Sequence, residues 1–262
     1  MSAALEALQS EDLGGGFRFA ELRAGGTVII AGALAPLDFH GLMSAASVNA
    51  RTRVEFHSWA ESLSPGAGAR LRGVDQVHGA VIAGAETLRD GRRVEADGVI
   101  ADSAHDVPVV LAADCAPVWL IDPSRRVSAL VHAGWRGIVA GVIESGVRAC
   151  VERGASARQL VAAVGPHLQA CCFEVGPEVA AQFPGHTRPA AMLVIERHRD
   201  DSVSLDAASS IAARLSSEGV RTIHVARACT RCRADILHSY RRNGKGGPLM
   251  GAICVTRIDK IA

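Results

Sequence analysis

Near-continuous apolar runs between residues 107 and 133 constrain the fold of this chain most strongly. VPVVLAA at 107–113 and VSALVHA at 127–133 are short and rich in β-branched residues, as is typical of strands. A run that is apolar at successive positions, and not only at alternate ones, indicates a strand that is buried on both faces. The sequence therefore predicts a sheet with a covering layer on each side.

Helical patterns alternate with these strands. Residues 138–153 and 205–219 carry apolar positions at helical spacing, and glycine ends each pattern, at Gly154 and Gly219. This alternation indicates an α/β fold with mixed strands in a single domain over residues 1–262, with a divergent region at 1–70. Further strands are expected at 27–32, 92–101, 160–164, 221–226 and 249–256, and loops at 13–16 and 64–69.

Length and charge exclude several classes of partner. A chain of 262 residues is compatible with one compact domain, and its net charge of +1 provides no long-range field for nucleic acid or an anionic membrane. No apolar stretch reaches the roughly 18 residues of a membrane helix, and the N-terminus lacks a signal-peptide core. We expect a cytoplasmic protein with a small-molecule substrate. The oligomeric state is not indicated.

Three short motifs supply a metal-ligand set. QVHG, AADC and HAGWRG contribute His78, Cys115 and His132, each at or just after the end of an apolar segment. Ends of neighbouring strands can converge at one edge of a sheet, where α/β proteins usually keep their sites. Two imidazoles and one thiolate suit Zn²⁺ and leave a fourth position open, as in catalytic zinc sites. Zinc in such a site can activate water or polarise a substrate atom.

Longer blocks around these motifs resemble one family. VDQVHG, ADGVIAD, VPVVLAADCAPVWLIDP, VSALVHAGWRGIVAGVIESGV, AAVGPHLQACCFEVGPEV and ACT…SYRR follow the order of the laccase-domain family, also called YfiH-like or multicopper polyphenol oxidoreductase. The resemblance implies a layered α/β sandwich in which His78, Cys115 and His132 bind zinc. It also implies phosphorolysis of adenosine, inosine, guanosine and methylthioadenosine, together with adenosine deamination.

Further residues are candidates for the same site. Asp97 in ADGV and Asp114 beside Cys115 could hold the metal ligands in place or act as acid and base. Arginine side chains suit phosphate through bidentate hydrogen bonds, and purine nucleoside and phosphate are the expected substrates. The candidate arginines are Arg136 in WRG, Arg241 and Arg242 in SYRR, and Arg23, which matches an N-terminal arginine of the family.

The resemblance to this family leaves other activities open, laccase activity and the editing of peptidoglycan precursors among them. A laccase copper cluster needs His-x-His pairs, but none of the ten histidines is separated from another by a single residue, which disfavours copper. An editing hydrolase for peptidoglycan precursors would use the same zinc, or Cys115 as a nucleophile. A non-catalytic zinc-binding module is the third alternative, because residues 38–50 and 245–248 depart from the family pattern.

The seven cysteines are an odd number and indicate reduced thiols more than a disulfide framework. Cys229-x-x-Cys232 looks like half of a zinc knuckle, which needs a second pair of ligands. Only the adjacent pair Cys171–Cys172 is available, and it lacks knuckle spacing. We therefore interpret that pair as small residues in a packed turn and expect no structural metal there.

Overall fold

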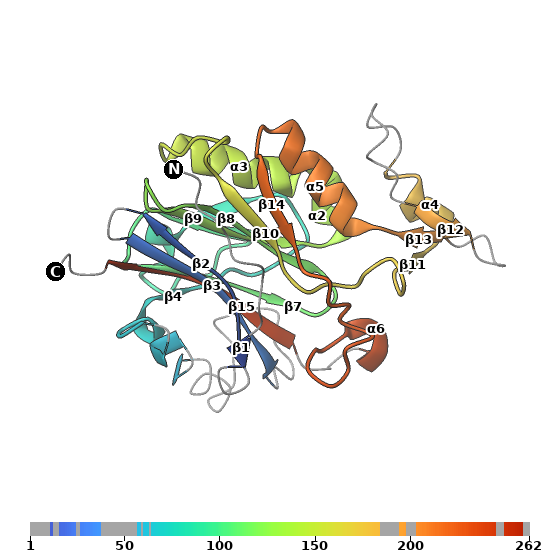
Figure 1. The fold of residues 1–262 in the computed structure, drawn as a ribbon, viewed down its shortest axis with the longest axis horizontal. Helices are drawn as coiled ribbons and strands as arrows, with labels where there is room; N and C mark the ends of the chain where they lie inside the picture. Colours follow the sequence, from blue (N-terminus) through green and yellow to red (C-terminus); the bar gives the residue numbers. More distant parts are fainter. Residues whose placement is uncertain are drawn as a thin grey trace.

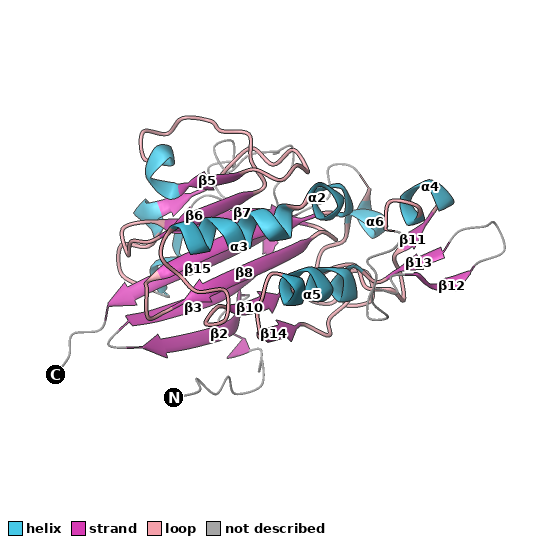
Figure 2. Cartoon of the chain, turned by 90° about the horizontal axis from the view of Figure 1, so that it is seen from above, coloured by secondary structure: helices cyan, strands magenta, loops and turns pink. Residues whose placement is uncertain are grey.

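The computed structural model arranges the chain in three layers, with helices over a central sheet and an outer sheet behind it (Figures 1 and 2). It describes residues 11–12, 16–24, 27–37, 57–58, 60–62, 64–183, 194–197, 203–244 and 249–258. Side chains are described from residue 57 onward, except those of 194–197 and of 249–258 apart from Ala252 and Cys254.

The central sheet has six strands among the described residues, in the order β14-β10-β8-β9-β6-β5. Antiparallel pairs join β10, β8, β9 and β6, whereas β14 and β5 are added in parallel at the two edges. The sheet is therefore mixed, as the sequence predicted. Its strands are β5 (Ile82–Gly84), β6 (Gly98–Ala101), β8 (Ala116–Asp122), β9 (Val127–Ala133), β10 (Val161–Val164) and β14 (Thr222–Val225).

The outer sheet follows the order β1-β2-β3-β15-β7-β4, and all of its pairs are antiparallel except β7 with β4. A small sheet, β11-β13-β12, lies with helix α4 at one end of the molecule (Figure 1). The outer strands are β1 (Glu11–Asp12), β2 (Gly16–Ala24), β3 (Thr27–Leu37), β4 (Leu71–Arg72), β7 (Val107–Ala112) and β15 (Leu249–Ile258). The small sheet comprises β11 (Glu174–Val175), β12 (Val194–Arg197) and β13 (Val203–Leu205).

Helices α2, α3 and α5 lie on the face of the central sheet opposite the outer sheet. Figure 2 shows α3 and α5 side by side across that face, with α2 beside the end of α3. The helices are α2 (Trp135–Ala140), α3 (Val142–Glu152), α4 (Pro177–Ala180), α5 (Ala207–Ser217) and α6 (Tyr240–Asn243), and two 3₁₀ turns cover Gly68–Arg70 and Ala85–Leu88.

Side chains of β8 alternate between two cores. Val118 and Leu120 pack in the cluster beneath the helices, whereas Trp119 and Ile121 pack in the cluster that faces the outer sheet. Successive residues of a strand point to opposite faces, so a strand covered on both faces needs apolar residues at every position. This confirms the prediction drawn from the continuous apolar runs.

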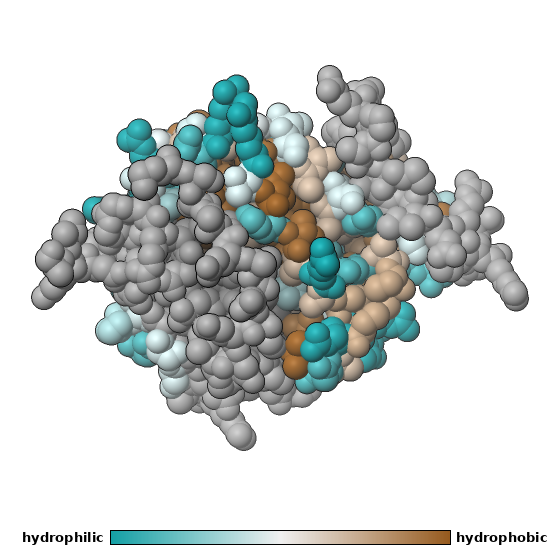
Figure 3. Space-filling view, viewed as in Figure 1, coloured by the Kyte–Doolittle hydropathy of each residue, from teal (hydrophilic) through white to brown (hydrophobic). Residues whose placement is uncertain are grey.

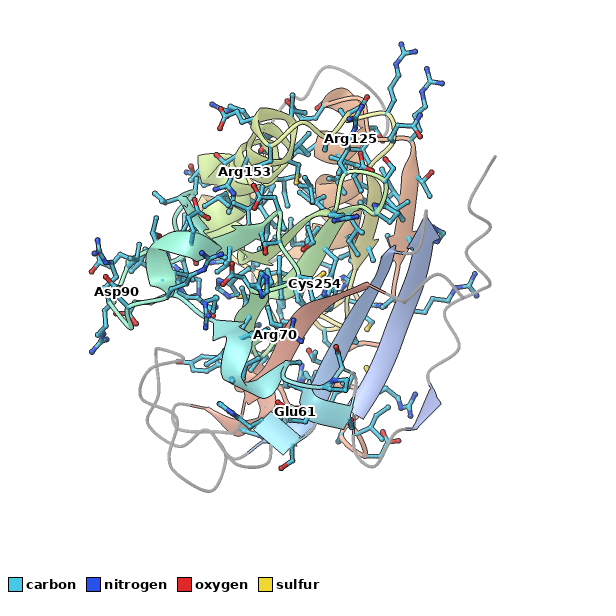
Figure 4. All side chains as sticks on the ribbon, turned by 90° about the vertical axis from the view of Figure 1, so that its left-hand side faces the viewer. Glu61, Arg70, Asp90, Arg125, Arg153 and Cys254 are labelled. Atoms are coloured by element: carbon cyan, nitrogen blue, oxygen red, sulfur yellow. The ribbon has the colours of Figure 1, made fainter. Side chains whose placement is uncertain are left out.

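The core between the two sheets is mostly aliphatic, in keeping with the low aromatic content. Leu130 of β9 packs there with Trp119, Val110 of β7 and Cys254 of β15. Figure 4 places Cys254 in the interior of the molecule, and its side chain is fully buried.

Several sequence predictions need correction. The helix expected over 138–153 is two helices, because Gly141 adopts a left-handed conformation (φ 90°), and the first of them, α2, begins earlier than expected, at Trp135. The strand expected over 92–101 is limited to β6. Eight strands of the described residues were not predicted, namely β1, β2, β4, β5, β8, β11, β12 and β13, and Gly16, expected in a loop, begins β2. The rest of that loop, 13–15, lies outside the described residues.

There is a clear physical reason why the sequence did not predict β8. Asp114, with φ 85°, interrupts the long apolar segment and divides it into β7 and β8. These two strands then enter different sheets. A sliding pattern of hydrophobicity cannot distinguish one long strand from two strands with a tight crossover between them.

The surface of this fold is mixed in character. Figure 3 shows apolar residues reaching the surface where β14 runs along the edge of the central sheet, and Val225 of that strand is 37% exposed. Among the described residues, no helix has both the length and the apolar character that crossing a membrane requires.

Truncating the core between the sheets tests this architecture. We expect Leu130→Ala to lower the free energy of unfolding by about 2–5 kcal/mol, because the fully buried side chain leaves a cavity between the two sheets. Val151→Ala removes a half-exposed side chain from α3 and should cost within about 0.5 kcal/mol. Urea denaturation measures both, and equal costs for the two variants would contradict the packing described here.

Candidate metal centre

The structure brings His78, Cys115 and His132 together. Their ligand atoms all lie within 4.8 Å of one another, and His78 Nε2 is 3.9 Å from Cys115 Sγ. The two imidazole rings meet edge to face, with their centroids 4.9 Å apart. The three side chains come from the loop between β4 and β5, the β7–β8 crossover and the end of β9. The three motifs therefore converge in the structure, as the sequence predicted.

Asp97 holds two of these three residues. Its fully buried carboxylate accepts a hydrogen bond from His132 Nδ1 at 2.9 Å, so Nε2 is the nitrogen of His132 that remains for a metal. The same carboxylate accepts the backbone N–H groups of Val77, His78 and Gly79 at 3.2, 2.9 and 2.6 Å. One side chain thus orients the ring of one ligand and the backbone of another.

The loop that carries His78 is also tied to β7. Gln76 Nε2 donates to the carbonyl of Leu111 and its Oε1 accepts the N–H of Leu111, both at 2.7 Å. His78 itself has φ 60°, a left-handed conformation that is uncommon for a residue with a side chain. The hydrogen bonds to Asp97 on both sides maintain this conformation, so the QVHG motif is a structural unit around the ligand.

Gly134 provides space for the ligands. A Cβ atom at this position would lie 2.9 Å from both Cys115 Sγ and His78 Cδ2, closer than real contacts of that kind. The small residue after His132 and Ala133 therefore keeps the centre open, and α2 begins directly after it. This contact explains the glycine of HAGWRG.

Electrostatics favour the deprotonated thiol. Burial raises the pKa of Cys115, but the charges and hydrogen bonds of His132 and His78 outweigh it and lower the pKa to about 6. Burial lowers the pKa of His132, but the negative charge of Cys115 and the hydrogen bond to Asp97 raise it to about 9. For Asp97, burial opposes ionisation, and the hydrogen bonds from His132 and from Gly79 still lower the pKa. At neutral pH these shifts favour a Cys115 thiolate and a His132 imidazolium beside the Asp97 carboxylate, and a cation that binds His132 Nε2 would displace its proton.

Asp114 connects the centre with the segment 229–243. Its carboxylate accepts Thr230 Oγ1 at 2.5 Å and the backbone N–H of Arg241 at 2.6 Å. Its backbone carbonyl accepts the N–H of Leu168 at 2.9 Å. These contacts favour a positioning role for Asp114, and the predicted acid–base role stays a prediction.

The predicted anion-binding arginines differ in their surroundings. Arg136 is exposed, stacks over Trp135 at 4.2 Å and has no ion-pair partner within the described part of the chain. Arg241 lies 5.9 Å over the Phe173 ring and donates to the Glu174 carbonyl at 3.0 Å.

Arg242 is more fully occupied. Its guanidinium donates to the carbonyls of Thr230, Arg231 and Leu237 and to Asn243 Oδ1. These bonds suit a residue that holds the loop together, and anion binding by Arg242 stays a prediction. Arg23 lies in β2, and its side chain is not among those described. The divergent segments 38–50 and 245–248 lie outside the described residues.

A second cluster corrects an expectation from the sequence. Cys171, Cys172, Cys229 and Cys232 lie with all four sulfur atoms within 4.8 Å of one another. The argument that Cys171–Cys172 could not complete a ligand set was wrong, because a turn over residues 169–173 brings both thiols to the same side. For Cys229, burial raises the pKa of the thiol, but hydrogen bonds from the backbone of Gln169, Cys232 and Arg231 lower it to about 7.

Both clusters are suited to a mononuclear metal ion. Among the described residues, only these two groups bring three or more possible ligands together, and one has two histidines while the other has none. Neither set resembles the histidine-rich ligands of a copper cluster.

Thr230, Gln76 and Gly134 were not assigned as functional residues from the sequence. Gln76 and Gly134 lie inside the motifs that carry the metal ligands, and Thr230 follows Cys229 in the ACT motif. Their positions in those short motifs were the available signal. Gln76 and Thr230 form hydrogen bonds with residues that lie 35 or more positions away in the sequence. Only the tertiary structure identifies these partners.

Comparison with known proteins agrees with these motifs. The chain is 37% identical over 186 residues to a purine nucleoside phosphorylase of Streptomyces coelicolor, covering 71% of this chain and 75% of that protein. It is 31% identical over 170 residues to a purine nucleoside phosphorylase of Clostridium acetobutylicum, covering 64% and 70%. An adenosine deaminase from an unknown prokaryotic organism is 31% identical over 137 residues, 52% of each chain.

Solved structures share the fold. YlmD from Geobacillus stearothermophilus superimposes with a TM-score of 0.77 at 23% identity, over 96% of this chain and 99% of that one. The Bacillus licheniformis protein YfiH gives a TM-score of 0.74 at 23% identity, over 87% and 92%. The family described as multi-copper polyphenol oxidoreductase laccase matches residues 46–256. The chain therefore belongs to this family and has its layered α/β fold.

Proposed function

We propose that this protein is a zinc-dependent purine nucleoside phosphorylase that also deaminates adenosine. The convergence of His78, Cys115 and His132 around Asp97 carries the proposal. The names of relatives that are 30–37% identical support the substrate class. Adenosine, inosine, guanosine and methylthioadenosine are the proposed nucleosides. Free cysteines throughout the described residues fit a reducing compartment such as the cytoplasm.

The donor set fits zinc. His78, Cys115 and His132 would hold the ion, since a thiolate and two neutral imidazoles are ligands that zinc prefers. Bound zinc would supply Lewis-acid polarisation and a source of nucleophilic water at neutral pH. Asp97 keeps the His132 ring in the orientation and tautomer that leave Nε2 free.

Arginines provide the complementary charge for phosphate. Arg136 at the start of α2 and Arg241 in α6 are exposed cations beside elements that carry site residues. In phosphorolysis, a phosphate oxygen bonds to the ribose C1′ while the bond from C1′ to the purine nitrogen breaks. Bidentate hydrogen bonds from arginine would hold the phosphate for that attack, and Asp114 fixes the backbone of Arg241.

One observation favours a second candidate. A partly buried thiol with a pKa of about 6 beside an imidazole with a pKa of about 9 is also the pattern of a cysteine nucleophile. Cys115 would then attack an amide carbonyl, as in an editing hydrolase for peptidoglycan precursors. This candidate needs no metal, so chelation separates the two proposals.

Product analysis tests the proposed reactions. Purified protein incubated with adenosine should release adenine only when phosphate is present, and should form inosine without phosphate. Chromatography of the products measures both, and Cys115→Ala is the inactive control. Neither product from a folded, zinc-loaded protein would contradict the proposal.

Removal of one ligand tests the role of the metal. His78→Ala should lose the zinc of this centre and its turnover while it stays folded, because two ligands hold zinc poorly. His105→Ala changes an exposed histidine outside the site and should keep both. Metal analysis and circular dichroism measure the outcome. Full activity of the wild type in chelator, with this centre free of zinc, would instead favour Cys115 as a nucleophile.

Asp97→Asn tests the positioning of the ligands. The neutral amide accepts hydrogen bonds less strongly, so we expect the zinc affinity of this centre to fall by about 10–100-fold. Asp106→Asn is a matched control, because Asp106 is also buried and ionically paired, but with Arg72 and Arg89 away from the site. Competition with a chromophoric chelator gives both affinities. Equal effects of the two substitutions would contradict the role of Asp97.

A further inference from the structure

The four-cysteine cluster lies apart from the residues of the proposed reaction. Cys171 and Cys172 occupy the turn before β11, while Cys229 and Cys232 follow β14. We propose that their four thiolates bind a second metal ion, zinc, in a structural site. The ligand pattern, an adjacent pair and a Cys-x-x-Cys pair about 60 residues apart, joins two distant segments of the chain.

The four sulfur atoms lie within 4.8 Å of one another, close enough to share one metal ion. Cys232 Sγ is 3.4 Å from Cys172 Sγ and 3.8 Å from Cys171 Sγ. A zinc ion bound to four sulfurs at about 2.3 Å separates those sulfurs by about 3.8 Å. The thiols are therefore spaced as ligands around one centre, and not as a bonded disulfide pair, whose sulfurs lie about 2 Å apart.

Contacts of the polypeptide hold the two cysteine-bearing segments beside each other. Residue 167 forms a β-bridge with 229, and the N–H of Thr230 donates to the carbonyl of His167 at 3.0 Å. Gln169 Nε2 donates to the carbonyl of Ala226 at 2.9 Å, beside the start of the second segment. The two segments are thus aligned by backbone and side-chain contacts, so a metal would meet ligands that are already close together.

Backbone groups favour the thiolate at one of the four cysteines. For Cys229, the one buried member, burial raises the pKa but hydrogen bonds from the backbone of Gln169, Cys232 and Arg231 lower it, whereas burial raises the pKa of Cys171 and of Cys172. Such hydrogen bonds disperse the negative charge of a thiolate that binds a metal. Zinc with four thiolates has a net charge of −2, and Arg231 and Arg233 flank Cys232 in the sequence. Binding releases the thiol protons and transfers no electrons.

The ligand type selects the metal. Four thiolates in a tetrahedron favour zinc or iron over metals that prefer oxygen ligands. With four protein ligands the coordination is complete, which is characteristic of a structural zinc site and not of a catalytic one.

The proposed ion would stabilise the segment that borders the other centre. Thr230 lies between two of the cysteines and donates to Asp114, next to Cys115. Phe173 follows Cys172 and lies beneath the Arg241 guanidinium. A zinc ion that joins 171–172 to 229–232 would therefore hold Thr230 and Arg241 in place.

Metal stoichiometry tests the proposal independently of activity. Mass spectrometry of metals in the wild-type protein, expressed with zinc and purified under reducing conditions, should find two zinc ions per chain. Cys232→Ser should retain one ion, and His78→Ala should also retain one. After exchange with cobalt, the absorption bands of tetrahedral four-thiolate cobalt should persist in His78→Ala and disappear in Cys232→Ser.

Controls keep the outcome decisive. Cys150→Ala alters a buried cysteine outside both clusters and should keep both ions. Zinc retained by the histidine centre of Cys232→Ser reports that this variant is folded. Unchanged zinc content in Cys232→Ser would overturn the proposal, as would a Cys172–Cys232 disulfide in place of a second ion. Iron lost in that variant would overturn the assignment of zinc.

Discussion

The buried carboxylate of Asp97 is the interaction on which the metal centre depends. It accepts hydrogen bonds from three consecutive backbone amides around His78 and from the ring of His132. An unpaired carboxylate at this depth would be unstable, so burial and ligand positioning require each other. The left-handed conformation of His78 is maintained by the same bonds, which makes the loop between β4 and β5 a fixed part of the site.

The crossover between β7 and β8 joins the two sheets and carries residues of the candidate site. Asp114 and Cys115 lie where the chain leaves the outer sheet and enters the central sheet. The Cys115 thiol is thereby placed beside the end of β9, and the Asp114 carboxylate binds the segment that contains Thr230 and Arg241. A fold with two packed sheets thus provides one point at which three distant segments meet.

The two clusters of candidate ligands suit different kinds of metal site, one catalytic and one structural. The centre of His78, Cys115 and His132 has three ligands and suits a reaction, whereas the four cysteines form a complete ligand set. The family's description refers to copper, but the ligands gathered in the described residues suit separate mononuclear ions. The relatives are named as purine nucleoside phosphorylases and as an adenosine deaminase, and the proposed reactions are those of these names.

The sequence alone predicted the α/β class and the candidate metal ligands His78, Cys115 and His132, because apolar runs and short motifs are local signals. It identified Asp97 but did not decide whether this residue was an acid or held the ligands. Only the tertiary structure decided that, since the partners of Asp97 lie 18 to 35 residues away. The four-cysteine cluster was misjudged for the same physical reason: ligand spacing along the chain does not report how a turn and a distant loop meet in space. The division at Asp114 into strands of two sheets likewise depends on a single backbone conformation, which hydrophobic periodicity does not record.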